Sequence, residues 1–360
     1  MGNVAQVRSD RHLWWARVTA ILWFLAGTAF LLSVPIVMQA SLWIMVGIAI
    51  VAAVLAGATA FVLMRLKGGK VRGRWIKGTI ALIFVLTAVA ASPVYYAATF
   101  TQVSPAMVPQ AVLSNGQKTV VFQGMQHVGT EVFFKTVVYD LEDALSRGSV
   151  AFYEGVKPSN PADDAWFDRT ITGGADLSSA YRELGEVCGL HFQSDYFGLL
   201  GRDAKEHPTA HVVADVDTAQ LHAEYTRLMR TDPAFAKAMN EREAQPAEDK
   251  TDGLEQIVNF LRSGSAEQKE TGAVLCRGYM TYASQRSSAS EIDKLILGYR
   301  NRVLADALLA EPRRRIYVTY GAAHLPGVLA LLQKADPRWK LQTVKWSRTI
   351  DYQENLTGKL

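Results

Sequence analysis

Lys118-Thr119-Val120-Val121-Phe122-Gln123-Gly124-Met125-Gln126-His127 is the stretch from which the fold can be read. Its first six residues form a run rich in β-branched and aromatic side chains, which predicts a β-strand, and a Gly-x-x-His motif follows at once. Arg315-Ile316-Tyr317-Val318-Thr319-Tyr320-Gly321-Ala322-Ala323-His324 repeats this arrangement, with a helix-like stretch after each motif. In open α/β sheets, ligands bind where strands end, so histidines on two neighbouring strands could converge on one metal ion. Either histidine taken alone could equally cap the helix that follows it.

Three long apolar runs precede these motifs, at residues 18–37, 42–64 and 79–100. Each is close to the roughly 20 residues that a transmembrane helix needs. The first run is too long for a cleavable signal peptide, and a second follows almost directly. The sequence therefore predicts a membrane anchor of three transmembrane helices over residues 1–100.

The connections between these runs predict an orientation. The second connection contains six basic residues and no acidic one, namely Arg65, Lys67, Lys70, Arg72, Arg74 and Lys77, whereas Gln39-Ala40-Ser41 is uncharged. The positive-inside rule places the basic connection in the cytoplasm, beside anionic lipid headgroups, and the chain after Phe100 outside it. Because this loop contributes much of the net charge of +4, a nucleic-acid partner is not implied.

The remainder of the chain is expected to be a linker over residues 101–112 and one α/β domain over 113–360. Further strands are predicted at Ser149–Tyr153, Lys340–Val344 and His211–Val213. Between Asp217 and Glu311 the apolar residues follow helical spacing, so helices should fill the middle of the domain. The two cysteines, Cys188 and Cys276, are either paired or simply buried.

Glu154 directly follows the apolar strand and should lie at the same edge of the sheet as the two histidines. One carboxylate and two imidazoles form a ligand set that leaves a position open for water on a divalent ion, and His127, His324 and Glu154 are the predicted ligands. Glu154 or Glu131 could act as the base, and Arg300 could stabilise an oxyanion. Each has a plainer interpretation: Glu154 as a helix-capping or salt-bridged acid, Glu131 as a first-turn acid, and Arg300 as a solvated or paired residue.

Four segments in this order resemble the TraB/PrgY/GumN family, which includes the Tiki metalloproteases. They are Gly124-x-x-His127, Phe152-Tyr153-Glu154, Arg300-Asn301-Arg302 and Tyr320-Gly321-Ala322-Ala323-His324-Leu325-Pro326-Gly327. The resemblance implies a metal-dependent hydrolase fold of the EreA/ChaN type, and it implies that His127, His324 and Glu154 are the functional residues. This chain differs from the family in having Tyr299 where Glu often precedes Arg-Asn, and in its three apolar runs before the domain.

Together these patterns predict a multi-pass membrane protein with an extracytoplasmic, metal-dependent hydrolase domain that acts on peptides or proteins. The expected cofactor is a divalent metal ion, either Mn, Co or Zn. The alternative is a non-catalytic extracytoplasmic protein that sequesters a peptide signal or a haem-like ligand in the same pocket.

Overall fold

The structure is a computed structural model that describes Trp14, Arg17, Val18, Ile21 and residues 96–174, 176–244, 264–285 and 289–351. The chain divides into two compact units, one of residues 1–103, 263–279 and 352–360, and one of residues 104–262 and 280–351. In the first unit, residues 96–103 are helical, and a Cβ added at Gly278 would lie only 2.6 Å from the Ala97 Cβ, so the chain needs glycine there. The second unit contains the sheet and every predicted site residue.

A mixed six-stranded sheet is the centre of the second unit, with strand order β6-β4-β7-β2-β1-β8. The strands are β1 (Ala106–Ser114), β2 (Thr119–Met125), β4 (Val150–Tyr153), β6 (His211–Val213), β7 (Arg315–Gly321) and β8 (Lys340–Ile350). The strands β2, β7, β4 and β6 are parallel, and β1 runs antiparallel to both of its neighbours. A second sheet pairs β3 (Val128–Gly129) with β5 (His191–Phe192).

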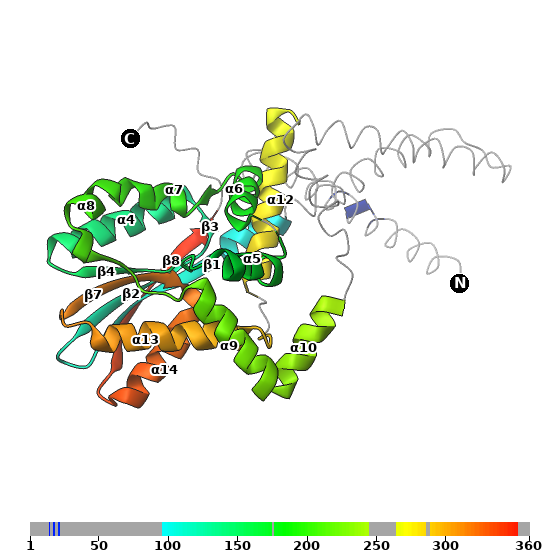
Figure 1. The fold of residues 1–360 in the computed structure, drawn as a ribbon. Coiled ribbons are helices and arrows are strands. Elements are labelled where there is room, and N and C mark those ends of the chain that lie inside the picture. Colours follow the sequence, from blue (N-terminus) through cyan, green and yellow to red (C-terminus); the bar gives the residue numbers. More distant parts are fainter. Residues whose placement is uncertain are drawn as a thin grey trace, which may run out of the picture. The chain divides into compact units, whose positions relative to one another are not determined.

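Helices cover both faces of the large sheet, as Figure 1 shows. The helix α4 (Glu131–Ser146) buries Phe133, Phe134, Val137, Val138 and Leu141 at helical spacing against one face. The helices α13 (Arg300–Ala310) and α14 (Leu325–Ala335) bury leucines and valines against the other. Because both faces are covered, β4 and β7 are almost continuously buried rather than alternating.

The described segments in the middle of the chain are mostly helical, as the sequence predicts, and some of them form a third apolar cluster around Leu221, Phe235 and Leu295. Its segments are α5 (Pro161–Thr170), α6 (Leu177–Cys188), α7 (Ser194–Phe197), η1 (Gly198–Leu200), α8 (Gly201–Glu206), η2 (Pro208–Ala210), α9 (Thr218–Thr231), α10 (Pro233–Ala244), α12 (Ala266–Ser284) and the π-helix η3 (Lys294–Tyr299). Neither Cys188 nor Cys276 is a free thiol.

The expectation of three N-terminal transmembrane helices is not supported, which corrects the predicted fold class to an α/β domain with a mixed sheet. Among the described residues, no helix has both the length and the apolar character that a membrane crossing requires. The longest helix named above, α12, carries Lys269, Glu270 and Arg277. Apart from Val18, Ile21 and residues 96–100, the three apolar runs lie outside the described residues.

The segment expected to be a linker, 101–112, also differs from the structure, because most of it belongs to β1. This strand pairs with β2 on one side and β8 on the other. Pro109 lies opposite Trp346 inside the strand, and the register with β8 shifts twice along it. The strand β8 also extends to Ile350, six residues beyond the predicted end at Val344.

Candidate functional site

The carboxyl ends of four parallel strands bring the candidate residues to one edge of the sheet. Glu154 directly follows β4, and its backbone N–H donates to Thr319 O at 3.0 Å, which extends the pairing with β7 by one residue. Likewise, Ala214 N–H donates to Tyr153 O at 3.1 Å, so Asp215 is held just beyond β6. Because β2 and β7 are adjacent and parallel, the two Gly-x-x-His motifs do follow neighbouring strands, as the sequence predicts.

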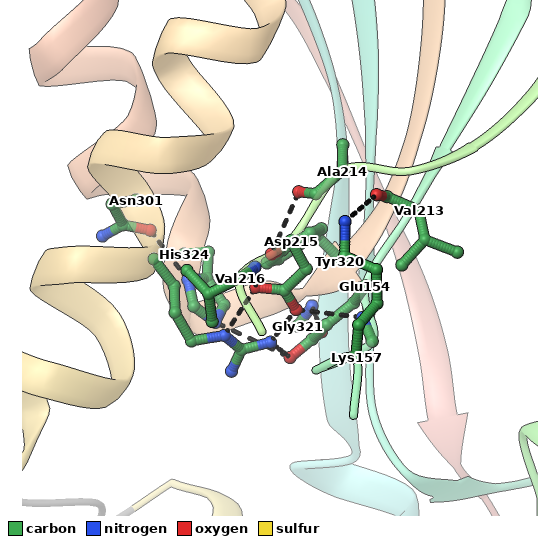
Figure 2. A network of polar contacts seen from close by, with 12 residues as sticks. Glu154, Lys157, Val213, Ala214, Asp215, Val216, Asn301, Tyr320, Gly321 and His324 are labelled. Carbon is green, nitrogen blue, oxygen red and sulfur yellow. Dashed lines mark hydrogen bonds and ion pairs between the residues drawn. The ribbon is translucent and has the colours of Figure 1, made fainter. Parts of the chain in front are cut away.

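Figure 2 shows the side chains of Glu154 and Asp215 close together at this edge, and Arg300 joins the two carboxylates. Its Nε donates to Asp215 Oδ1 at 3.0 Å, and its Nη2 donates both to Asp215 Oδ2 at 2.5 Å and to Glu154 Oε1 at 2.7 Å. The other oxygen of Glu154 accepts the backbone N–H of Gly321 at 2.6 Å. Arg300 therefore orients Glu154 through one partly buried ion pair, and the buried pair with Asp215 holds Arg300 itself in place.

Asp215 is the buried centre of this network. Its side chain is 0% exposed, and it accepts the backbone N–H groups of Gly155 at 2.9 Å and of Val216 at 2.8 Å. Burial opposes the charge, but the Arg300 guanidinium outweighs it and lowers the pKa of Asp215 below its usual value. For Arg300, burial alone would lower the pKa, yet the bonds to Asp215 raise it, so the guanidinium stays charged.

His324 is a buried, neutral imidazole. Burial in the first place and the nearby charge of Arg300 in the second lower its pKa to about 4. Its Nδ1 lies 2.7 Å from Asn301 Oδ1, so Nδ1 carries the proton and Nε2 has a free lone pair. That Nε2 atom lies 3.8 Å from Glu154 Oε1. Two atoms bound to one ion at about 2 Å each can be no more than about 4 Å apart, so this pair has the spacing of two metal ligands.

Two glycines of the second motif permit this close packing. A Cβ added at Gly321 would lie 3.3 Å from Glu154 Oε2, and one added at Gly327 would lie only 2.2 Å from Asn301 Nδ2. The sequence Gly321-Ala322-Ala323-His324-Leu325-Pro326-Gly327 therefore holds the histidine, its amide partner and the carboxylate in contact. In the first motif, Gly124 serves close approach rather than a sharp turn, because its Cβ would lie 2.8 Å from Pro109 O.

Neither histidine caps a helix through its side chain. The N-cap of α4 is Thr130, whose side chain accepts from Phe133 N–H, and His324 precedes α14 without a capping hydrogen bond from its side chain. The capping interpretation of the two motifs is therefore wrong for this structure. What remains for His324 is the contact with Asn301 and the free Nε2.

His127 lies at the edge of the same site. It is exposed, its Nδ1 is 3.1 Å from the side-chain amide of Gln193, and its ring stacks on Tyr181 with centroids 4.5 Å apart. Although the residue is exposed at the surface, the groups packed around its ring exclude part of the water, and this lowers the pKa of His127. The charge of Glu154 raises that pKa and the charge of Arg300 lowers it. His127 is therefore within electrostatic range of both residues.

Glu131 is not brought into this network. It opens α4 and pairs with Lys135 one turn later at 2.8 Å, on a face where both side chains are more than a third exposed. The hydrogen bond from Lys135 lowers the pKa of Glu131, as for an ordinary surface carboxylate. The interpretation as a first-turn acid fits this position.

Asp215 is one residue of the candidate site that sequence reasoning missed. It follows the weak strand His211–Val213 much as Glu154 follows β4, so the same argument from strand ends would have indicated it. Tyr320 was also missed. It packs its ring edge-on against His324, with centroids 4.8 Å apart, and it lies under the Arg300 guanidinium at 5.5 Å.

Comparison with known proteins identifies no family or function for this site. No protein-family model, no curated protein and no solved structure matches the chain. Within the described residues, no group of three His, Cys, Asp or Glu side chains is arranged to hold a metal ion. The donor chemistry that fits a metal is thus the pair His324 and Glu154, with the His127 imidazole as the candidate third ligand.

Proposed function

We propose that this domain is a metal-dependent hydrolase whose divalent ion is held by His324, Glu154 and His127. The observation that carries the proposal is the neutral His324 imidazole, whose unprotonated Nε2 lies 3.8 Å from the Glu154 carboxylate. Asn301 on Nδ1 is the outer hydrogen-bond partner that metal-binding histidines usually have. The resemblance to the TraB/PrgY/GumN family supports the same three residues.

The protein side chains would prepare the site, and a bound ion would supply a water of lowered pKa as nucleophile. Arg300 holds Glu154 in its orientation, because its Nη2 donates to the carboxylate at 2.7 Å. Within the described part of the chain, Nη1 of Arg300 makes no hydrogen bond, so its two N–H groups can bind an oxygen that becomes negative in the transition state. Asp215 holds the guanidinium in place for both tasks.

Peptides are the proposed substrate class, from the family resemblance. The test is to incubate the full chain with a defined peptide library and Mn²⁺, Co²⁺ or Zn²⁺, and to detect new peptide termini by mass spectrometry. Glu154→Gln keeps an acceptor for the Gly321 N–H but removes the negative charge. The Glu154→Gln protein, purified in the same way, is therefore the matched control for a contaminating peptidase. Cleavage by the wild type and none by Glu154→Gln supports the proposal, and equal cleavage by both contradicts it.

A second candidate is a non-catalytic binding protein for a peptide or a haem-like ligand. Two observations favour it: the described residues contain no complete three-ligand group, and Glu154 already pairs with Arg300. The same library separates the candidates, since saturable retention of an unchanged peptide indicates binding and new termini indicate hydrolysis.

A further inference from the structure

The imidazole of His127 is held by a side-chain amide that the proposed function does not use. Gln193 touches His127 twice: its backbone N–H donates to His127 O at 3.0 Å, and its amide lies 3.1 Å from Nδ1. The antiparallel pairing of β3 with β5 sets this contact. Val128 lies opposite Phe192, so His127, just before β3, lies beside Gln193, just after β5. The contact is therefore built into the fold of the first motif.

An aromatic ring also packs against His127 and helps to fix the orientation of its imidazole. Tyr181, from α6, stacks on the imidazole at 4.5 Å with the planes 27° apart, and it stacks in turn on Phe192 at 6.2 Å. One face of the imidazole is covered and Nδ1 is engaged. Among the residues that the structure describes, none forms a hydrogen bond with the other ring nitrogen, Nε2, which leaves this atom open to a ligand.

The same two kinds of contact hold the other histidine. His324 has an amide on Nδ1, from Asn301, and a tyrosine ring against the imidazole, from Tyr320. At His324 the amide oxygen faces Nδ1 and fixes the proton there. At His127 the atom placed nearest Nδ1 is Gln193 Nε2, but a carboxamide exchanges its O and N by a half turn with little change in shape.

We infer that Gln193 is a positioning residue that turns its Oε1 to His127 Nδ1–H and so leaves Nε2 of His127 unprotonated. This inference rests on the proposed function in one respect: the free Nε2 is the atom that would bind the metal. With the opposite amide orientation, Gln193 would donate to Nδ1 and the proton would sit on Nε2, where it blocks ligation. With the inferred orientation, Oε1 towards Nδ1–H, both motifs would present an unprotonated Nε2 to one ion.

The test is the tautomer of His127, read by long-range ¹H–¹⁵N NMR on the metal-free full chain with ¹⁵N-labelled histidine. Only seven histidines contribute signals, and His127→Gln identifies the one of interest. We expect Nδ1–H in the wild type and in Gln193→Glu, because a carboxylate can only accept. Gln193→Ala should release the ring to the Nε2–H form, and Gln333→Ala, which removes an amide bonded to Trp339 O, should change nothing at His127. Nε2–H in the wild type, or no change in Gln193→Ala, overturns the inference.

Metal titration separates this inference from the proposed function. With Zn²⁺ or Co²⁺, Gln193→Ala should bind about 10- to 100-fold more weakly than the wild type, the usual effect of removing an outer hydrogen-bond partner, and Gln193→Glu should restore binding. If the wild type binds neither ion, the proposed function fails, while the tautomer result still decides the role of Gln193. If the wild type binds an ion and Gln193→Ala binds it equally well, the inference fails and the proposed function stands.

Discussion

Arg300 donates two hydrogen bonds to Asp215, and the two side chains are 9% and 0% exposed, respectively. Removing one partner of a buried ion pair leaves the other charge uncompensated, which costs about 3 to 5 kcal/mol. Asp215→Asn leaves Arg300 with only the partly buried Glu154 as a counter-charge, so it should lower the free energy of unfolding by up to about that amount. Chemical denaturation of the metal-free protein measures the change.

A surface pair provides the control for this prediction. Asp195 contacts Arg182 at 3.1 Å with both side chains nearly half exposed, so Asp195→Asn should cost less than about 1 kcal/mol. Equal effects of the two substitutions would show that the Asp215 pair is no more important to stability than an ordinary surface ion pair.

Gly327 provides a second prediction, because a Cβ there would lie 2.2 Å from Asn301 Nδ2. Gly327→Ala should push Asn301 away from His324 Nδ1 and lower stability by about 1 to 3 kcal/mol, the cost of overpacking a well-packed site. Gly201 has nothing within 4 Å of its added Cβ, so Gly201→Ala should leave stability nearly unchanged. Thermal unfolding of both variants checks the difference; a Gly327→Ala protein as stable as the wild type would mean that Asn301 moves freely.

The pKa of His324 leads to a prediction about pH. It is lowered to about 4 in the folded chain, from an ordinary value of 6.5, so the unfolded chain binds more protons between these two values. Stability from this group is therefore complete above pH 6.5 and declines as the pH falls towards 4, by about 3 kcal/mol in total.

His324→Gln removes the titrating group and should flatten this part of the stability curve. Denaturation at several pH values in chelating buffer, for the wild type and for His324→Gln, isolates the contribution. Parallel curves for the two proteins across this range would contradict a buried neutral His324.

Much of the sheet could be predicted from the sequence, because β2, β4, β7 and β8 are made of alternating or continuous β-branched and aromatic residues. The strand β1 could not, since Pro109 and the prolines and glutamines around it are typical of a linker. Its place between β2 and β8 depends on pairing with two strands, one of them more than 200 residues away, and no local pattern reports that.

The candidate site divides in the same way. Glu154 and His324 follow strongly patterned strands, and the structure brings them within 3.8 Å. Asp215 follows a strand of three residues that is defined mainly by its pairing with β4, and Gln193 reaches His127 only through the short β3–β5 pairing. Contacts of this kind depend on packing between segments that are distant in the chain, so no local sequence pattern predicts them.

The central claim is that His324, Glu154 and His127 bind one divalent ion, and calorimetric titration of the full chain with Zn²⁺ or Co²⁺ tests it most directly. His207 is the matched control. It is a surface histidine outside the candidate site, 63% exposed, and its Nδ1 lies 3.0 Å from Asp203 Oδ1. The account predicts one ion per wild-type chain, the same for His207→Ala, and binding lost or greatly weakened in His127→Ala and Glu154→Gln. Equal binding in all four proteins, or none in the wild type, would contradict it.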